Sequence, residues 1–495
     1  MITTDKNDRP IYMKTILQSL LAVFIFVICS VKSSADINTD KIIKPEFEHS
    51  FQCIKIVRAL ERHHYLEKKF DDRMSSTIFN TYLKSLDPAK QLFTEQDINL
   101  LKNYQFRFDD DLKKGRLNFG YKIFNLFMIR SKQRLEYITS LIKTWEKTLD
   151  FTKNESMIID IDSRKWKENK SELYFLWKKE LKNHVISMML DDQKAASITD
   201  TLEKTYSNRL NRLLQTNSTD IFQVFMNSVT MSFDPHTQFF PPRASEDFDI
   251  HMSLSLEGIG AVLQTEYEYT KVIRLIPKGP ADKSNLLMPG DKIIGVGQGI
   301  EGEIKDTIGQ RIDHVVKLIR GPKNSFVRLK IIPAKKNKSI KTIQIKRERV
   351  KLEDQSAKKN IITIDQDRQT FKLGVIEIPN FYIDFNAYYR GDKDYKSTTK
   401  DVQKLLIELK DEAIDGLIID LRDNGGGSLK EANQLTGLFL KSGPVVQIRT
   451  KHKTRRLYDR DPRIDYSGPL IVLINRMSAS ASEIFAAAMQ DYNRA

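Results

Sequence analysis

Cysteine is scarce in this sequence, with two residues in 495. Cys29 lies inside an N-terminal apolar segment, and Cys53 stands alone after it. If the apolar segment is removed on export, Cys53 has no cysteine in the same chain with which to pair. The sequence therefore excludes an internal disulfide from such a mature chain.

Metal-binding and nucleotide-binding signatures are also lacking. The chain has no zinc-finger spacing, no P-loop and no dinucleotide fingerprint. Its one close histidine pair, His63 and His64, consists of adjacent residues, which do not share a helix face. We expect neither a metal site nor a cofactor.

Charge of one sign is not concentrated anywhere, although the formal net charge is +15. Lysine and arginine are spread along the chain between acidic residues, which is typical of a solvated surface. We therefore expect no nucleic-acid partner. The length suits about three domains, and the hydrophobic content of 40% is sufficient for packed cores.

A single long hydrophobic run occupies residues 16–31, after Lys14 and before the sequence KSSAD. A basic start, a short apolar core and small residues before a cut are the three parts of a secretory signal. We predict a signal peptide over residues 1–35, cleaved after Ala35, with Met13 as an alternative start. Export implies the periplasm in a Gram-negative source. The alternative is an uncleaved segment that holds the protein at the inner membrane.

Glycine is nearly missing between residues 40 and 235, where only Gly115 and Gly120 occur. Apolar residues recur there at steps of three and four, as in Ile54, Val57 and Leu60, which predicts amphipathic helices. We interpret residues 36–235 as a helical N-terminal domain.

Glycine becomes frequent again after residue 250, and short predicted strands rich in β-branched residues begin there. Residues 256–261 (LEGIGA) are followed by Gly279-Pro-Ala281 and by residues 287–293 (LMPGDKI). These features resemble a PDZ domain, which we place at residues 245–345. The resemblance implies that the first loop holds a peptide's C-terminal carboxylate on backbone amides, at Gly258, Ile259, Gly260 and Ala261.

The peptide in this interpretation adds a strand to the sheet edge, and its last side chain enters an apolar pocket. We expect Ile259, Ala261 and Leu263 to line that pocket, opposite a helix at residues 315–319.

Strands and helices alternate from residue 346 onward. Residues 373–379 and 416–421 are predicted strands, and residues 401–409 are a predicted helix. The second strand runs into Gly425-Gly426-Gly427, and Ser428 with Glu431 forms a capping box for the next helix. A glycine turn before a helix can also cradle a phosphate, but the Lys-Ser/Thr end of a P-loop is missing.

A serine-rich turn, residues 478–482 (SASAS), separates an apolar run at residues 470–474 from the helix former at residues 483–489. The run has the pattern of a strand buried on both faces. A serine at such a turn lies beside the free amides of a helix N-terminus, which suits a nucleophile that generates an oxyanion. Ser480 and Glu483 equally fit a capping box. The two roles are compatible, because Ser478 or Ser482 can cap while Ser480 reacts.

Five features follow one another along the chain: the helical segment LERHHY, the joining segment FDPHTQFFPPR, the PDZ features, the LRDNGGG turn and the segment SASASEIFAAAMQDY. Together they resemble the carboxy-terminal processing, or tail-specific, serine proteases. The resemblance implies a multidomain α+β protein whose protease core, residues 346–495, has an α/β fold of the crotonase/ClpP-like kind. It implies Ser480 as nucleophile, with oxyanion donors at Ala481 and at Gly426 or Gly427.

The family's general base is a lysine about 25 residues beyond the serine, an offset that comes from the resemblance alone. The sequence ends at Ala495, 15 residues after Ser480. We therefore expect a protease core that is incomplete at its C-terminus, a fragment of a longer reading frame, and a chain that is inactive on its own.

The implied partners are the apolar C-terminal tails of exported or membrane proteins, and an adaptor protein that delivers them is left open. A second hypothesis is a non-catalytic PDZ module that captures protein C-termini. A third is a scaffold that holds partner proteins through the helical region.

Overall fold

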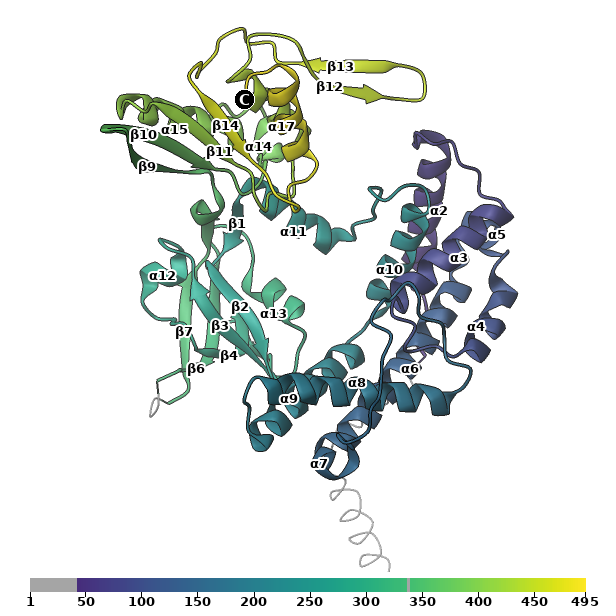
Figure 1. Ribbon diagram of the computed structural model, residues 1–495. Helices are drawn as coiled ribbons and strands as arrows, with labels where there is room; N and C mark the ends of the chain where they lie inside the picture. Colours follow the sequence, from purple (N-terminus) through teal and green to yellow (C-terminus); the bar gives the residue numbers. More distant parts are fainter. Residues whose placement is uncertain (1–41, 336–338) are drawn as a thin grey trace, which may run out of the picture. The chain divides into compact units, whose positions relative to one another are not determined.

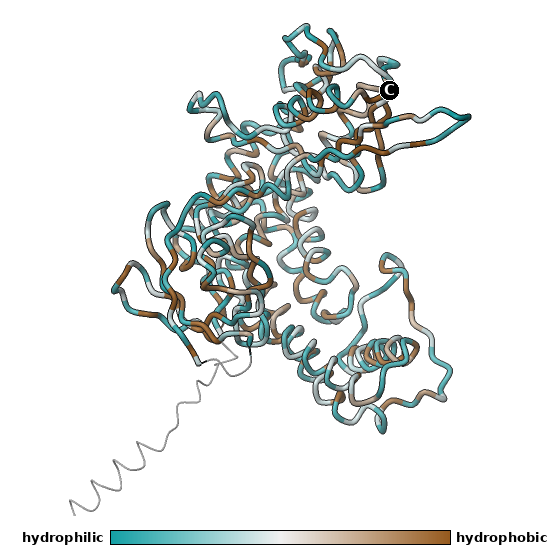
Figure 2. The backbone as a smooth tube through the Cα atoms, turned by 90° about the vertical axis from the view of Figure 1, so that its left-hand side faces the viewer, coloured by the Kyte–Doolittle hydropathy of each residue, from teal (hydrophilic) through white to brown (hydrophobic). Residues whose placement is uncertain are grey.

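The computed structural model describes residues 42–335 and 339–495 (Figure 1). The predicted signal peptide and its cleavage site lie outside these residues. Among the described helices, none is both long and apolar enough to cross a bilayer. Figure 2 colours the chain by hydropathy, and apolar segments recur among the helices and among the strands.

The first part of the chain is helical, as predicted. Its helices are α2 (Phe47–His63), α3 (Asp72–Leu86), α4 (Glu95–Leu101), α5 (Phe108–Lys113), α6 (Asn118–Ile142), α7 (Trp145–Thr148), α8 (Lys170–Leu190), α9 (Ala195–Leu214), α10 (Ser218–Met231) and α11 (Pro242–Ser253), with a 3₁₀ turn at Lys102–Tyr104.

Side-chain caps begin several of these helices. Asp71, Thr94, Asn169 and Asn217 each accept a hydrogen bond from the backbone amide three residues on. Between α6, α8 and α9 lies one apolar core, which includes Ile138, Trp145, Leu173, Trp177, Leu181, Ile198, Leu202 and Tyr206. Isolated helices of this length are only marginally stable in water, so burial of these side chains supplies most of the stability of the region.

Cys53 faces the interior of the helical region. It is a free, buried thiol, and burial raises its pKa to about 12. The thiolate is therefore scarce at neutral pH, and the side chain behaves as a small apolar residue.

The second part is an antiparallel sheet in the strand order β2-β3-β4-β6-β7, with β5 paired to β4. Its elements are β2 (Ala261–Glu266), β3 (Tyr269–Leu275), α12 (Pro280–Ser284), β4 (Lys292–Gln298), β5 (Ile304–Asp306), α13 (Ile312–Ile319), β6 (Phe326–Ile332) and β7 (Lys341–Lys346). The strand β2 lies at one edge of this sheet. Helix α13 coincides with the helix predicted beside the peptide groove.

Two short strands flank this sheet in the sequence. They are β1 (Ser255–Gly258) and β8 (Glu348–Lys351), which pair antiparallel with each other. A 3₁₀ turn at Glu353–Gln355 follows them.

The third part is a four-stranded sheet in the order β14-β11-β10-β9. The strands β10, β11 and β14 are parallel, and β9 runs antiparallel to β10. The elements are β9 (Lys358–Gln366), β10 (Gln369–Glu377), α14 (Phe385–Tyr389), α15 (Thr398–Asp411), β11 (Gly416–Asp420), α16 (Leu429–Gly437), the hairpin β12 (Pro444–Arg449) and β13 (Thr454–Tyr458), β14 (Leu470–Leu473) and α17 (Ala481–Asp491).

The predicted elements of this region are confirmed, but β14 differs in its burial. The prediction of a strand buried on both faces is wrong, because Ile471 is 56% exposed. In the described sheet β14 is an edge strand, and only β11 pairs with it. An uninterrupted apolar run does not distinguish an edge strand from a central one.

A buried ion pair joins α4 to α6 in the helical region. Arg130 Nη2 donates to Asp97 Oδ1 at 2.6 Å, and Arg130 Nε donates to Oδ2 at 2.8 Å. Burial pushes the pKa of Asp97 upward, but hydrogen bonds from Arg130 and Thr94 outweigh it and hold this pKa below its usual value. The ionised carboxylate therefore stabilises the fold above the unfolded pKa, and this contribution is lost as the pH falls through the lowered folded pKa.

We predict that Asp97→Asn lowers the free energy of unfolding by about 3 kcal/mol, because it leaves the Arg130 charge buried without its partner. The fluorescence of Trp145, Trp166 and Trp177, the three tryptophans of the chain, reports urea unfolding of this region. The exposed Asp110→Asn serves as the matched control, with little change expected. Equal stability of the two variants at pH 7 would contradict the prediction.

Candidate active site

The serine turn connects β14 to α17, and Ser480 is the N-cap residue of α17. Its backbone has φ 55° and ψ −113°, a conformation that residues with a side chain rarely adopt. The predicted capping box is present, and Ser480 N donates to Glu483 Oε2 at 2.6 Å. Strained residues of this kind concentrate at active sites, where the surrounding structure holds them.

The three serines of the turn have different environments. Ser482 is fully buried and its hydroxyl donates to the Asn424 carbonyl at 2.9 Å. The Ser478 hydroxyl donates to the Leu421 carbonyl at 2.8 Å. Ser480 is exposed. The expectation that Ser478 or Ser482 caps α17 is therefore wrong, because their hydroxyls bond to the glycine turn instead.

The glycine turn lies beside the serine turn because β11 and β14 are parallel neighbours, so that their carboxyl ends meet at one sheet edge. Asn424, which is fully buried, connects the two turns. Its Nδ2 donates to the Ile378 carbonyl at 2.7 Å, and its Oδ1 accepts from Gly426 N at 2.9 Å. Its backbone carbonyl accepts from Ala479 N at 3.1 Å and from the Ser482 hydroxyl.

A second link joins the outer ends of the two turns. Asp423 N donates to Asn475 Oδ1 at 3.0 Å, and Asn475 Nδ2 donates to Asp423 Oδ1 at 2.9 Å. Neither Asn424 nor Asn475 is among the predicted site residues. For Asn424 the available signal was local, since asparagine next to glycine favours turns in which its side chain bonds to the backbone.

Gly426 packs directly against the serine turn. A Cβ built at Gly426 would lie 2.7 Å from Ser480 Cβ, and the residue has φ +105°. Gly427 has φ +140°, and a Cβ there would lie 2.4 Å from the Phe381 carbonyl oxygen. Both positions therefore require glycine for close approach as well as for conformation.

The backbone amides of the two turns are not equally available. Gly426 N donates to the Asn424 side chain, as described above. Within the described residues, Gly427 N and Ala481 N have no hydrogen-bond acceptor. Ala481 is the first residue of α17, so its amide carries part of the positive end of the helix dipole.

The predicted capping box at Ser428 and Glu431 is only half present. The Ser428 hydroxyl accepts from Glu431 N at 3.3 Å. The Glu431 carboxylate is fully buried and accepts instead from the Ser397 hydroxyl and from Thr399 N, both at 2.8 Å. Partners on a distant segment therefore replace the reciprocal half of the box.

No lysine of the described region hydrogen-bonds to the Ser480 hydroxyl. Lys430, the second residue of α16, donates to Tyr395 Oη at 3.1 Å and to Gln434 Oε1 at 2.6 Å. It also lies over the Tyr388 ring, 4.3 Å from the centroid. Within residues 42–335 and 339–495, no group of three or more His, Cys, Asp or Glu side chains is arranged to hold a metal ion.

The predicted carboxylate loop joins β1 to β2. Gly258 ends β1, Ala261 begins β2, and the amides of Ile259 and Gly260 have no acceptor in the part of the chain that the structure describes. The Ile259 carbonyl accepts from Ala281 N at 2.8 Å, so the two PDZ-like features contact each other.

The side chains around this loop divide between core and groove. Ile259 is 2% exposed and belongs to the core with Val315 and Ile319 of α13, so its predicted place in the pocket lining is largely taken up by the core. Ala261 and Leu263 of the edge strand β2 are partly buried against this core.

Comparison with known families matches three successive segments of the chain. The family described as "Tail specific protease N-terminal domain" matches residues 56–243, the PDZ domain matches residues 247–332, and peptidase family S41 matches residues 372–495. Residues 372–495 belong to peptidase family S41, and residues 56–243 form the N-terminal domain of the tail-specific proteases. The predicted family resemblance and the multidomain α+β fold are therefore confirmed.

Individual relatives agree with this assignment. The chain is 40% identical over 437 residues to the tail-specific protease of Haemophilus influenzae, a match that covers 88% of this chain and 60% of that protein. It is 30% identical over 259 residues to the carboxy-terminal processing protease CtpB of Bacillus subtilis, covering 52% of this chain and 47% of that protein. The chain thus spans 60% or less of the length of these two relatives.

Among solved structures, the PDZ domain of the carboxy-terminal protease from Vibrio cholerae, crystallised in complex with peptide, is 46% identical. That match covers 20% of this chain and 100% of the crystallised chain, with a TM-score of 0.19.

We predict that Gly426→Ala disrupts the contact between the two turns at a cost of about 1–3 kcal/mol, because the new methyl group overlaps Ser480 in a strained backbone. Hydrogen exchange of peptides from β11, β14 and α17 measures the local loosening. Gly425→Ala is the matched control, since nothing lies within 4 Å of its Cβ position. Equal exchange in both variants would refute the proposed contact.

Proposed function

We propose that this chain is part of a serine endopeptidase that binds the apolar C-terminal tails of exported or membrane proteins and cleaves them upstream. The observation that carries the proposal is the exposed Ser480, held in a strained turn beside two unpaired amides. The proposed domains are a signal peptide at residues 1–35, a helical domain at 36–235, a PDZ domain at 245–345 and a protease core at 346–495. The periplasm is the proposed location.

In the proposed mechanism, the Ser480 hydroxyl attacks the scissile carbonyl and its proton passes to a general base. The negative oxygen that develops is stabilised by backbone N–H groups. Ala481 N is one donor. Gly427 N is the favoured second donor, because Gly426 N is occupied by Asn424. Gly426 supplies the close packing that brings the two turns together.

The family resemblance implies that the general base is a lysine. A lysine is neutral near pH 7 only if its surroundings exclude water and so lower its pKa. Lys430 does not fill this role, since Tyr395 and Gln434 accept from its ammonium group. We therefore propose that Lys430 is not the base and that the 495-residue chain is inactive on its own.

Substrate capture is proposed at the β1–β2 loop. The peptide carboxylate accepts from the amides of Ile259 and Gly260, with Gly258 and Ala261 shaping the loop on either side. The peptide then pairs with the edge strand β2, opposite α13. The free amides of this loop equally favour a second function, a non-catalytic module that captures C-termini.

For the protease, we predict that Ser480→Ala in the protein isolated from its source reduces cleavage of a fluorogenic peptide by a factor on the order of 10⁴ or more, because the nucleophile is lost. Ser478→Ala is the matched control and should keep most of the activity. The 495-residue chain alone should show no Ser480-dependent cleavage. Cleavage by the natural protein that survives Ser480→Ala would exclude Ser480 as nucleophile.

For substrate capture, we predict that a peptide with an apolar, free C-terminus binds the Ser480→Ala chain about 10-fold or more tightly than its C-terminally amidated twin. The reason is that charge-assisted hydrogen bonds to the carboxylate are lost in the twin. Isothermal titration of both peptides measures the difference. Equal affinities would argue against carboxylate capture, for the enzyme and for the binding module alike.

A further inference from the structure

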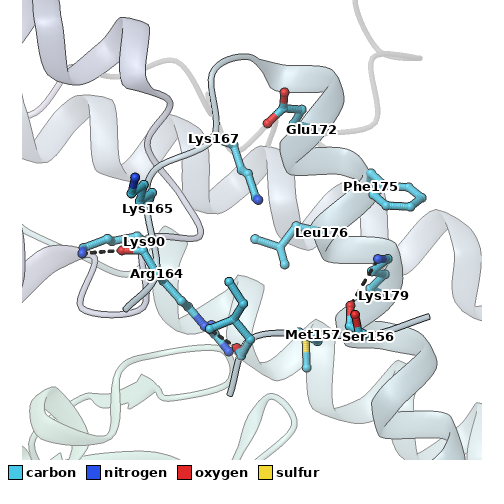
Figure 3. Close-up of a pocket in the computed structure, with 11 residues that line it drawn as sticks. Lys90, Ser156, Met157, Arg164, Lys165, Lys167, Glu172, Phe175, Leu176 and Lys179 are labelled. Carbon is cyan, nitrogen blue, oxygen red and sulfur yellow. Dashed lines mark hydrogen bonds between the residues drawn. The ribbon is translucent and has the colours of Figure 1, made fainter. Parts of the chain in front are cut away.

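The helical region contains a cationic pocket that the proposed protease function does not use. It is a cavity of about 350 Å³ between α8 and the long connection that precedes it (Figure 3). Its lining residues are Lys90, Ser156, Met157, Ile158, Arg164, Lys165, Lys167, Glu172, Phe175, Leu176 and Lys179. We refer to these residues as the cationic pocket.

The connection that forms one wall is anchored to the helical core at several points. Trp166 Nε1 donates to Asp87 Oδ2 at 3.2 Å, and the Lys167 carbonyl accepts from Glu95 N at 2.7 Å. Lys90 Nζ donates to the Arg164 carbonyl at 2.5 Å, and Lys179 Nζ donates to the Ser156 carbonyl at 3.3 Å. These contacts fix the position of the connection against the helical core.

The charges of the pocket are unbalanced. It has five cationic side chains and one carboxylate, that of Glu172. Lys90, Arg164 and Lys179 donate only to carbonyl oxygens, and in the described structure none of the five cations forms a salt bridge. Acidic residues of the same connection, Asp160 and Asp162, do not line the cavity.

The charges of Lys165 and Lys167 make no contact that stabilises the fold in the described part of the chain. Their ammonium groups have no hydrogen-bond or ion-pair partner among the described residues, and Figure 3 shows the Lys167 side chain pointing toward Leu176 across the cavity. Unpaired like charges that line one cavity repel one another, and an anion in the cavity would relieve the repulsion.

The walls also expose apolar surface. Phe175 is 57% exposed and Ile158 is 56% exposed, and Met157 and Leu176 lie beside them. Lys179 lies over the Phe175 ring, 4.6 Å from its centroid. A ligand that matches this lining carries carboxylates next to an aromatic or aliphatic group. The volume falls in the range of roughly 300–1,000 Å³ that is usual for specific pockets.

We propose that the cationic pocket binds an acidic peptide segment of a partner or substrate protein, with one apolar side chain between carboxylates. The carboxylates pair with Lys165, Lys167 and Arg164, and the apolar side chain contacts Phe175 and Met157. The free C-terminus of the peptide is not involved, which separates this site from the proposed PDZ groove. The pocket then provides a second, internal recognition point on the same chain.

Fluorescence anisotropy of a labelled, C-terminally amidated peptide, Asp-Glu-Phe-Asp-Glu, tests the proposal on the full 495-residue chain. The double variant Lys165→Gln/Lys167→Gln should weaken binding about tenfold, because two ion pairs to the peptide are lost, one at the exposed Lys165 and one at the half-buried Lys167. The double variant Lys114→Gln/Lys147→Gln changes the net charge equally at exposed positions away from the pocket and should leave the affinity unchanged.

Two further peptides test the chemistry. Replacing the acids by Asn and Gln should abolish binding, and replacing Phe by Ser should weaken it severalfold. Equal affinity for the acidic and the amide peptides would overturn the proposal. It would also be overturned if the lysine variant lost binding only to vesicles of one part phosphatidylglycerol to three parts phosphatidylcholine, which would identify a lipid surface instead. Amidated peptides and a binding readout keep both outcomes independent of catalysis and of the PDZ groove.

Discussion

The arrangement of the candidate active site depends on the hydrogen bonds of one buried amide side chain. Asn424 has no contact with solvent, and its side-chain oxygen and nitrogen both have partners. Because its backbone carbonyl also accepts from the serine turn, Asn424 fixes the distance between two loops that come from different strands. Buried polar networks of this kind specify a single geometry only when every member is satisfied, which is the case here.

The strained backbone of Ser480 follows from the same constraint. The turn is held on one side by Glu483 and on the other by the bonds from Ala479 and Ser482 to Asn424. A side chain at Gly426 would occupy the space that Ser480 needs. The absence of a Cβ at one position thus permits an unfavourable φ at another, and the surrounding contacts offset its cost.

The sequence predicted the elements well because apolar periodicity and glycine content change abruptly between the three regions. It did not distinguish Ser478, Ser480 and Ser482 by any local feature. In the structure their burial, their hydrogen bonds and the strained backbone of Ser480 separate them. Asn424 and the partners of Glu431 were equally inaccessible, since Ile378, Ser397 and Thr399 lie far away in the sequence and meet these residues only in the folded chain. Local patterns identify turns, whereas tertiary contacts decide which polar atoms remain free.

The proposed carboxylate site and the proposed oxyanion site use the same kind of group at different places in the chain. At the β1–β2 loop and at the glycine turn, the available groups are backbone amides next to glycine, and both target a negatively charged oxygen. Backbone amides cannot titrate and cost little entropy to position, so they suit a carboxylate that must be recognised and an oxyanion that forms only briefly. The cationic pocket instead presents flexible lysines, which suit acidic segments of variable sequence. In the proposed functions, recognition by backbone therefore fixes geometry at the chain end and at the scissile bond, and recognition by side-chain charge tolerates variation elsewhere in the bound protein.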